Sequence, residues 1–315
     1  MEHVNHFYNI LTEVCKEEGI KEEKLSFDWI TKLTKGDKVH FAVRNQFDIN
    51  SSTSTLIAGD KYATYSVLRN NEIPICEHQI VFNPKLREDY YDENFIIGIK
   101  MLLSEHGAIV IKGNNSYGGR EVFKETSLDG AIDIITKLFN ENNVSSVSVC
   151  PYMDLNKEYR CIYLDGEVLL LYEKSKPVIL GNGKNTLKEL MDFYIEEHEE
   201  EHDESVDDIY VEVPLEYIPK DGEEINIGWK FNLEQGGTPR ILNIDENKEI
   251  VDLAIKAAKA IGINFASVDV AEEKNGNLSI MEINGSVCMT KFSCIAPNGF
   301  NITKEIYRKV LHKIF

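Results

Sequence analysis

The chain has 315 residues, of which 43% are hydrophobic and 28% charged, a composition typical of a folded protein with more than one subdomain rather than of a disordered chain. Its 34 basic and 53 acidic side chains give a formal net charge of −19, which argues against a sequence-independent grip on nucleic acid and against binding to an anionic membrane. No apolar run approaches ~18 residues and the N-terminus has no apolar signal core, so we expect neither a membrane span nor secretion.

The cysteine pattern indicates a reducing compartment. The six cysteines form no CxxC pair and show no Cys/His zinc spacing, and most have apolar neighbours in the sequence. We therefore expect reduced, mostly buried thiols in a cytoplasmic protein.

Hydrophobic periodicity and turn residues predict the elements of the chain in order. In the first part we expect a helix over 3–18, a strand over 39–43, a Ser/Thr-rich loop over 51–55, a helix from 60 to 70, a strand over 73–75 and a polar connector over 83–93. In the middle we expect a helix over 94–106, a strand over 108–112, a glycine loop over 113–119, a strand over 120–124, a helix over 128–140 and a strand over 144–150. In the last part we expect strands over 158–164 and 167–173, a helix from 186 that ends in the acidic run 196–208, a strand over 223–229, a polar loop over 232–240, a helix over 247–260, strands over 265–271 and 278–283, and a helix over 300–313.

Three polar residues lie in the last two of these strands. Asn275-Gly276 between two β-rich runs predicts an antiparallel hairpin. Asp269 lies among apolar neighbours in its first strand, and Glu282 and Asn284, two residues apart, point to one face of its second strand. Two carboxylates and an amide oxygen suit a hard cation such as Mg²⁺ held together with nucleotide phosphates. Edge-strand acids that face solvent are the alternative.

The glycine loop after the middle strand is a candidate phosphate site. Closely spaced glycines let backbone amides approach an anion, although a plain hairpin turn has the same composition. The loop is neither a P-loop nor a dinucleotide fingerprint, because the spacing of both fails. Lys112 ends an apolar strand, where an unpaired ammonium would be costly, and this favours a bound anion.

Three other patterns in the sequence do not by themselves identify a functional site. His198 to His202 matches HExxH, but the acidic run around it lacks the apolar face of a zinc-protease helix. No nucleophile signature such as GxSxG is present. The charges of Glu158, Arg160 and Lys174 are explained either by cross-strand ion pairs or by contact with a transferred phosphoryl group.

Taken in order, these segments resemble the ATP-grasp carboxylate-amine ligases, in particular the ATP-grasp module of cyanophycin synthetase and of the fused bacterial glutathione-synthesising enzymes. The similarity extends over about residues 50–290. It is carried by six segments: Asp60–Pro74, which matches the pattern DKxxTxxxLxxxxIP; Ile109–Val122; Glu158–Arg160; Lys176–Leu190; Phe231–Thr238; and Met281–Asn284.

The resemblance implies roles for particular residues. Lys61 and Lys112 would contact the nucleotide phosphates, Glu158 the ribose, and Arg160, Lys174 and Arg240 the γ-phosphate or an acyl phosphate as catalytic residues. The loop over the phosphates would include Ser116, Tyr117, Gly118 and Gly119. The adenine hinge would be the backbone of Cys150, Pro151, Tyr152 and Met153. Mg²⁺, with Mn²⁺ as a possible substitute, would be held by Asp269, Glu282 and Asn284, with Glu282 bridging two ions.

The implied fold is α+β, an ATP-grasp fold that holds the nucleotide between two α+β subdomains and is preceded by a small α/β N-terminal domain. We expect residues 1–85 to form that N-terminal domain, 86–152 the central subdomain with the glycine loop, and 153–315 the C-terminal subdomain with the metal site. The implied activity is an ATP-dependent, ADP-forming ligation of an amino acid or peptide through an acyl phosphate, and the oligomer considered is a homodimer. Two alternatives stay open, a nucleotide-binding regulatory module without turnover and a small-molecule kinase on the same fold.

Two departures from the family pattern concern the substrates. Ser286–Cys288 replaces the proline-glycine turn that usually follows the metal strand, and this turn lies near the acceptor amine in such ligases. Residues before 50 match no segment of the family, and in such ligases this part helps to select the donor.

Overall fold

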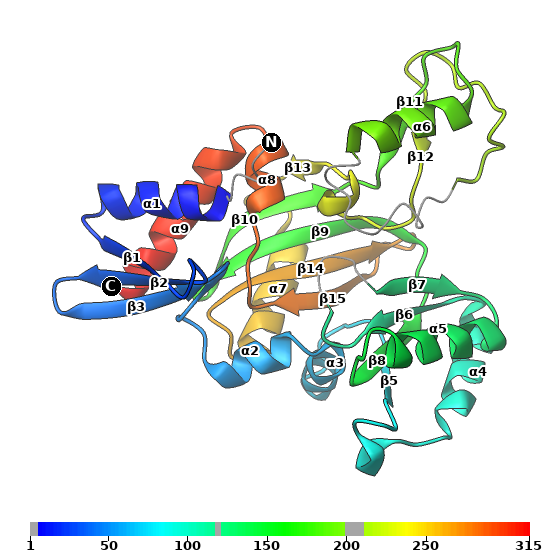
Figure 1. Ribbon diagram of the computed structural model, residues 1–315, viewed down its shortest axis with the longest axis horizontal. Coiled ribbons are helices and arrows are strands. Elements are labelled where there is room, and N and C mark those ends of the chain that lie inside the picture. Colours follow the sequence, from blue (N-terminus) through cyan, green and yellow to red (C-terminus); the bar gives the residue numbers. More distant parts are fainter. Residues whose placement is uncertain (1–5, 117–120, 199–210) are drawn as a thin grey trace. The chain divides into compact units, whose positions relative to one another are not determined.

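The computed structural model in Figure 1 describes residues 6–116, 121–198 and 211–315. The chain forms two compact units, one of residues 1–172 and 241–315 and the other of residues 173–240, and each is described by itself. The three-part division expected from the sequence remains a prediction. Within the described ranges no helix has both the length and the apolar character needed to cross a membrane.

The N-terminal part of the larger unit is a four-stranded antiparallel sheet with two helices against it. Its elements are α1 (His6–Glu17), β1 (Lys21–Leu25), β2 (Ile30–Lys35), β3 (Lys38–Val43), β4 (Gln46–Phe47) and the C-terminal α9 (Gly299–Ile314). Figure 1 shows α1 and α9, from the two ends of the sequence, side by side. The rings of Phe7 and Tyr307 join them, with centroids 5.3 Å apart. The strands β1 and β2 were not expected from the sequence.

Two short helices connect this sheet to the rest of the unit, α2 (Ser52–Ala58) and α3 (Lys61–Asn70). The predicted loop over 51–55 is wrong, because Ser51 caps α2 by accepting a hydrogen bond from the Ser54 N–H at 3.0 Å. Asp60 caps α3 in the same way through the Ala63 N–H at 2.8 Å. The predicted strand over 73–75 is reduced to one bridge, Ile75 to Ile280.

A second antiparallel sheet has the order β5-β8-β6-β7, and α4 and α5 pack against it. The bounds are β5 (Gln79–Phe82), α4 (Phe95–His106), β6 (Ile109–Gly113), β7 (Val122–Glu125), α5 (Leu128–Asn140) and β8 (Ser146–Pro151), with one 3-10 turn (Glu88–Tyr90) in the predicted connector. Ile109, Ile111, Val147 and Val149 alternate along their strands and form the core under the helices.

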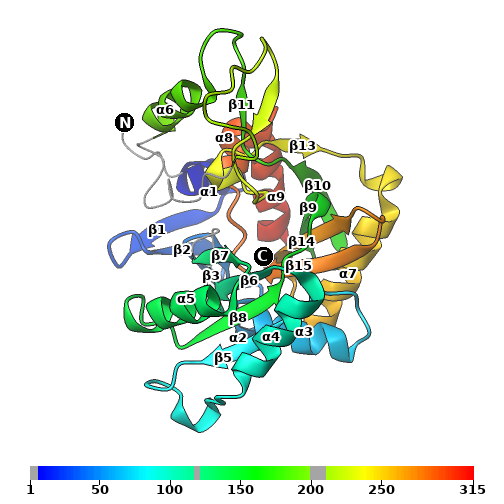
Figure 2. The ribbon, with the colours of Figure 1, turned by 90° about the vertical axis from the view of Figure 1, so that its right-hand side faces the viewer.

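The central sheet has the order β13-β10-β9-β14-β15. Its elements are β9 (Leu155–Leu164), β10 (Glu167–Lys174), β13 (Pro239–Ile241), a 3-10 turn (Ile244–Glu246), α7 (Lys248–Ile261), β14 (Phe265–Glu273), β15 (Leu278–Asn284) and α8 (Thr290–Ile295). Asp165 and Gly166 both have positive φ, at 44° and 98°, as a two-residue hairpin turn requires. Helix α7 covers one face of β9, β14 and β15, as Figure 2 shows, and the apolar side chains of this face form a core cluster with those of the helix. The helix α8 was not expected.

The smaller unit contains α6 (Leu187–His198), the antiparallel pair β11 (Val178–Leu180) and β12 (Glu224–Asn226), and a 3-10 turn (Leu233–Gln235). The predicted helix from 186 is confirmed, whereas the predicted strand over 223–229 is only three residues long. The acidic run beyond residue 198 lies outside the described residues.

Candidate functional site

The polar residues of the predicted hairpin lie on the face of the central sheet opposite α7. Val268 and Val270 of β14 and Ile280 and Ile283 of β15 belong to the core under α7. Alternation therefore turns Asp269 to the other face. The pairing of β14 and β15 sets Asp269 opposite Glu282 and Ser267 opposite Asn284. A register shift after Asp269 lets Ile280 face the core under α7 while Glu282 lies on the opposite face with Asp269. The predicted hairpin is confirmed.

Arg160 and Asp269 form a bidentate ion pair across β9 and β14. They are register partners, and the guanidinium Nε and Nη2 donate to the two carboxylate oxygens at 2.7 Å each. The Asp269 side chain is 3% exposed and that of Arg160 is 22% exposed. Burial alone would lower the pKa of Arg160, but the adjacent Asp269 carboxylate raises it well above its usual range. Arg160 therefore stays cationic, and its guanidinium is engaged by Asp269.

Glu282 is an ionised carboxylate in a positive environment. Burial alone would raise its pKa, but the ammonium groups of Lys61 and Lys112 and the hydrogen bond from Asn284 outweigh burial, and the net pKa is lowered. The Asn284 Nδ2 donates to the Glu282 Oε1 at 2.8 Å. Glu282 is thus bonded to Asn284 and lies within the electrostatic reach of Lys61 and Lys112.

Lys61 holds the start of the glycine loop. Its ammonium donates to the carbonyl oxygens of Gly113 at 3.2 Å, Asn114 at 3.4 Å and Ser116 at 2.5 Å. Burial is the largest cause that lowers its pKa, the neighbouring Lys112 lowers it further, and Glu282 opposes both. The side chain is 9% exposed and satisfied by backbone oxygens, so it fixes the loop whatever ligand binds.

Lys112 lies at the end of β6 among negative groups. Burial alone would lower its pKa, but Cys150, Glu282, Cys76 and Glu158 raise it, so the net pKa is above its ordinary value. The neighbouring Cys76 thiol, with Lys112 and Lys61, lowers the pKa of Cys150 to about 7, although burial alone would raise it. Across the described residues all six cysteines are free thiols, and Cys15, Cys76, Cys150 and Cys161 are buried.

The predicted hinge has one residue whose N–H is open to a ligand. Cys150 pairs with Val110 within the sheet, Pro151 has no N–H, and the Tyr152 N–H donates to the Ala108 carbonyl at 2.9 Å. Met153 follows the strand, and its N–H bonds to no group of the described residues. Met153 is therefore the residue of the predicted hinge whose N–H could bond a ligand without breaking a bond within the described residues.

Three of the predicted site residues, Tyr117, Gly118 and Gly119, lie outside the described residues. Lys174 and Arg240 belong to the smaller unit, where Lys174 is buried and the Arg240 Nη2 contacts the Glu173 Oε2 at 2.5 Å. The larger unit brings together the remaining candidates from β6, β8, β9, β14, β15 and α3.

Two residues of this region were missed from the sequence. Asn114, 1% exposed, accepts a hydrogen bond from the Tyr62 N–H through its Oδ1 at 3.1 Å and so ties the glycine loop to α3. His78 is 3% exposed, and its Nδ1 lies 2.5 Å from the Ser148 Oγ. Burial, with Lys112 and Lys61 nearby, lowers the pKa of His78 to about 3, so the imidazole is neutral. A lone histidine before a short strand gives no signal in the sequence that its side chain will be buried beside Lys61 and Lys112.

The candidate ligands fit magnesium by chemical type. Among the residues that the structure describes, no cluster of three or more His, Cys, Asp and Glu side chains is placed to hold a metal. Asp269, Glu282 and Asn284 instead offer two carboxylates and one amide oxygen, which are hard donors suited to Mg²⁺ completed by phosphates and water. An ion at Asp269 has to share its carboxylate with Arg160.

The carboxylate-bearing strands β14 and β15 and the sheet with Lys112 and the glycine loop belong to one unit. Residues 172–310 match the family model described as the RimK-like ATP-grasp domain. The match covers less than half of the chain, and the overall structure agrees with the ATP-grasp fold expected from the sequence.

Several known proteins are similar to this chain at low sequence identity. The chain is 25% identical over 307 residues to the glutathione biosynthesis bifunctional protein GshAB of Clostridium perfringens, covering 90% of this chain and 37% of that protein. It is 22% identical over 275 residues to the cyanophycin synthetase of Trichormus variabilis, covering 82% of this chain and 29% of that protein. The crystal structure of a bifunctional glutathione synthetase from Pasteurella multocida superimposes with a TM-score of 0.55 at 15% identity, covering 95% of this chain and 44% of that one. The chain is thus similar to these proteins at a distance and spans about a third of the length of the two curated relatives.

Proposed function

We propose that the chain is an ATP-dependent, ADP-forming ligase that joins a carboxylate to an amine through an acyl phosphate. The observation that carries this proposal is the placement of Asp269, Glu282 and Asn284 on one sheet face within the electrostatic reach of Lys61 and Lys112. These residues match a nucleotide with magnesium in charge and in ligand type. The proposed location is the cytoplasm.

In this proposal the protein supplies fixed charges and positions. Bound ATP and Mg²⁺ would supply the phosphoryl group and neutralise its charge as it moves. Lys112, kept cationic by its negative neighbours, would bind the phosphates, and Lys61 would hold the loop start against them. Glu282 stays ionised and so would remain a ligand at neutral pH. Arg160 would orient Asp269, as its two hydrogen bonds do here.

The substrate class follows from the relatives. One curated relative is named for glutathione biosynthesis and another is a cyanophycin synthetase. Glutathione is a small peptide, and amino acids or small peptides are therefore the substrates that we propose. The proposal does not select the donor or the acceptor.

The test incubates the purified protein with ATP, Mg²⁺ and pools of amino acids and small peptides. We expect ADP and phosphate only when a carboxylate and an amine are both present, together with a product whose mass equals their sum less one water. Glu282→Gln should abolish turnover, whereas Glu249→Gln, on the exposed side of α7, should leave it unchanged. ADP release that no pair stimulates and that Glu282→Gln does not affect contradicts the proposal, and a stable phosphorylated product favours a kinase.

A further inference from the structure

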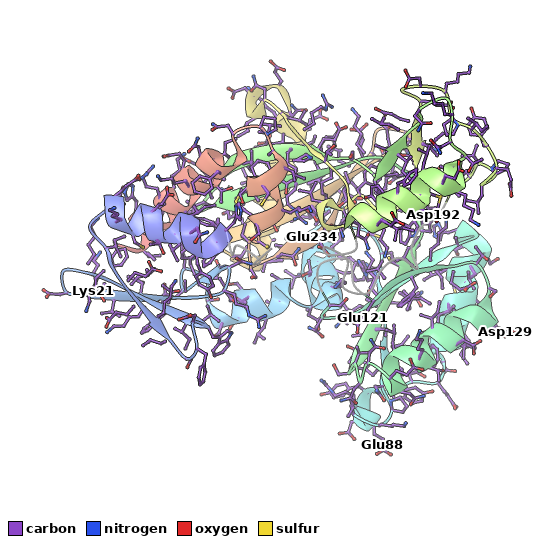
Figure 3. All side chains as sticks on the ribbon, turned by 45° about the horizontal axis from the view of Figure 1, so that its top comes forward. Lys21, Glu88, Glu121, Asp129, Asp192 and Glu234 are labelled. Atoms are coloured by element: carbon purple, nitrogen blue, oxygen red, sulfur yellow. The ribbon has the colours of Figure 1, made fainter. Side chains whose placement is uncertain are left out.

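A cavity of about 580 Å³ opens beside the N-terminal sheet and takes no part in the chemistry proposed above. Its walls are Phe7 and Tyr8 of α1, the turn 26–29 between β1 and β2, the turn at Arg44 and Asn45, and Thr290 at the start of α8. In Figure 3, Lys21 marks this sheet at the left of the view, whereas Asp129 of α5, the helix that packs against the sheet with the glycine loop, lies at the right. The lining of the cavity includes none of the candidate site residues.

Two opposite charges line the cavity without a partner. Within the described ranges, neither the Arg44 guanidinium nor the Asp28 carboxylate makes a hydrogen bond or ion pair with another residue. Both act on the Tyr8 hydroxyl, whose pKa is raised first by burial, then lowered by Arg44 and raised by Asp28, so both charges lie near this one hydroxyl. The Tyr8 hydroxyl itself donates to the Asp28 carbonyl at 2.8 Å.

Neighbouring charges on the same sheet are paired. Lys24 contacts Glu22 and also donates to Thr31, and Glu23 lies 3.5 Å from Lys21 and 3.3 Å from Lys32. Arg44 and Asp28 thus differ from these paired neighbours on the sheet.

The cavity also presents aromatic surface that folding leaves outside the core. Phe27 is fully exposed and Trp29 is 51% exposed. Ser26, Phe27 and Asp28 have φ of 51°, 55° and 66°, three consecutive residues in a region that non-glycine residues rarely adopt. Such backbone strain persists where the surroundings over-determine it, often at ligand sites. The strained turn keeps Phe27 and Asp28 at the cavity instead of allowing Phe27 to pack into the core.

We propose that this cavity binds a free α-amino acid with an aromatic or large apolar side chain. The Arg44 guanidinium would hold the α-carboxylate, the Asp28 carboxylate the α-ammonium, and Trp29, Phe27 and Tyr8 the side chain. Both groups that a ligase joins would then be engaged by the protein, so this site recognises its ligand and does not activate it. The proposal therefore stands or falls independently of the ligase activity.

The fluorescence of Trp29 tests the proposal directly. The chain has two tryptophans, so Trp229→Phe leaves Trp29 as the single reporter. In this background L-phenylalanine should change the emission in a saturable manner. L-phenylalaninamide lacks the carboxylate, N-acetyl-L-phenylalanine lacks the ammonium and glycine lacks the side chain. Each should bind at least about tenfold more weakly, as expected for the loss of a charge-assisted hydrogen bond or of the stacking surface.

Substitutions of Arg44 and Asp28 test which group of the ligand each side chain binds. Arg44→Gln should weaken the binding of L-phenylalanine about tenfold, so that L-phenylalanine and its amide bind equally well. Asp28→Asn should make L-phenylalanine and its N-acetyl form bind equally well. Arg87→Gln, the same change beside Phe82 and Tyr90, should bind like the parent. The absence of a saturable response to L-phenylalanine overturns the proposal, and so does equal binding of L-phenylalanine and its blocked forms by the parent protein, a result that does not depend on any variant at the cavity.

Discussion

The Asp269→Asn substitution removes one partner of the bidentate ion pair with Arg160. The Asp269 side chain is 3% exposed, so water screens the pair weakly, and removal of one partner from a buried pair costs about 3–5 kcal/mol of unfolding free energy. Arg160 is 22% exposed, and Glu282 on the next strand provides part of the lost negative charge. We therefore expect the lower end of this range, about 3 kcal/mol.

For a chain of this size such a loss corresponds to a fall in Tm of roughly 6–12 °C, at about 2–4 °C per kcal/mol. Thermal unfolding followed by circular dichroism measures it, with Asp252→Asn on the exposed side of α7 as the matched control. Arg160→Met and the double variant complete a double-mutant cycle, in which we expect the double variant to be more stable than the sum of the two single effects predicts. A Tm within about 2 °C of the parent for Asp269→Asn, or strictly additive effects, refutes the reasoning.

Three further predictions concern other parts of the larger unit. The pKa of His78 is about 3 in the folded protein, against an ordinary value of 6.5. Between these pH values the unfolded chain binds a proton that the native protein does not. The free energy of unfolding therefore falls as the pH drops, by up to about 1.4 kcal/mol per pH unit. The stability difference between the parent and His78→Gln, measured by urea unfolding, should shrink from pH 6.5 to 4, and a constant difference contradicts this. Lys112→Met should weaken ATP binding in calorimetry at least tenfold, since a charge-assisted contact is lost, whereas Lys100→Met on exposed α4 should not, and equal affinity for both variants counts against the phosphate role. Ser51→Ala should cost about 1 kcal/mol through loss of the hydrogen bond to the Ser54 N–H, and urea unfolding with no shift in midpoint rejects the cap.

The sequence predicts well those features that depend on local periodicity. Alternation along β15 gives Glu282 and Asn284 a common face, and the Asn-Gly pair gives the hairpin. Helices with a clear apolar stripe, such as α1, α5 and α7, were predicted within a few residues of their bounds.

Contacts between distant segments were not predictable in this way. The pair of Arg160 and Asp269 depends on the register of two strands whose residues are 109 positions apart. The Ser/Thr-rich segment 51–55 has the composition of a loop, but one cap and tertiary packing make it helical. The turn of Ser26, Phe27 and Asp28 has no glycine at its left-handed positions, so its composition gives no signal of its shape.

The most direct test of the central claim is the transfer of oxygen from the donor substrate to phosphate. Once a reacting pair is known, the donor carboxylate is labelled with ¹⁸O and the released phosphate is analysed by mass spectrometry. Activation through an acyl phosphate predicts one ¹⁸O atom from the donor in each phosphate, and the product amide retains the other. Phosphate without label, formed together with the amide, contradicts the mechanism that we assign to Asp269, Glu282 and the two lysines.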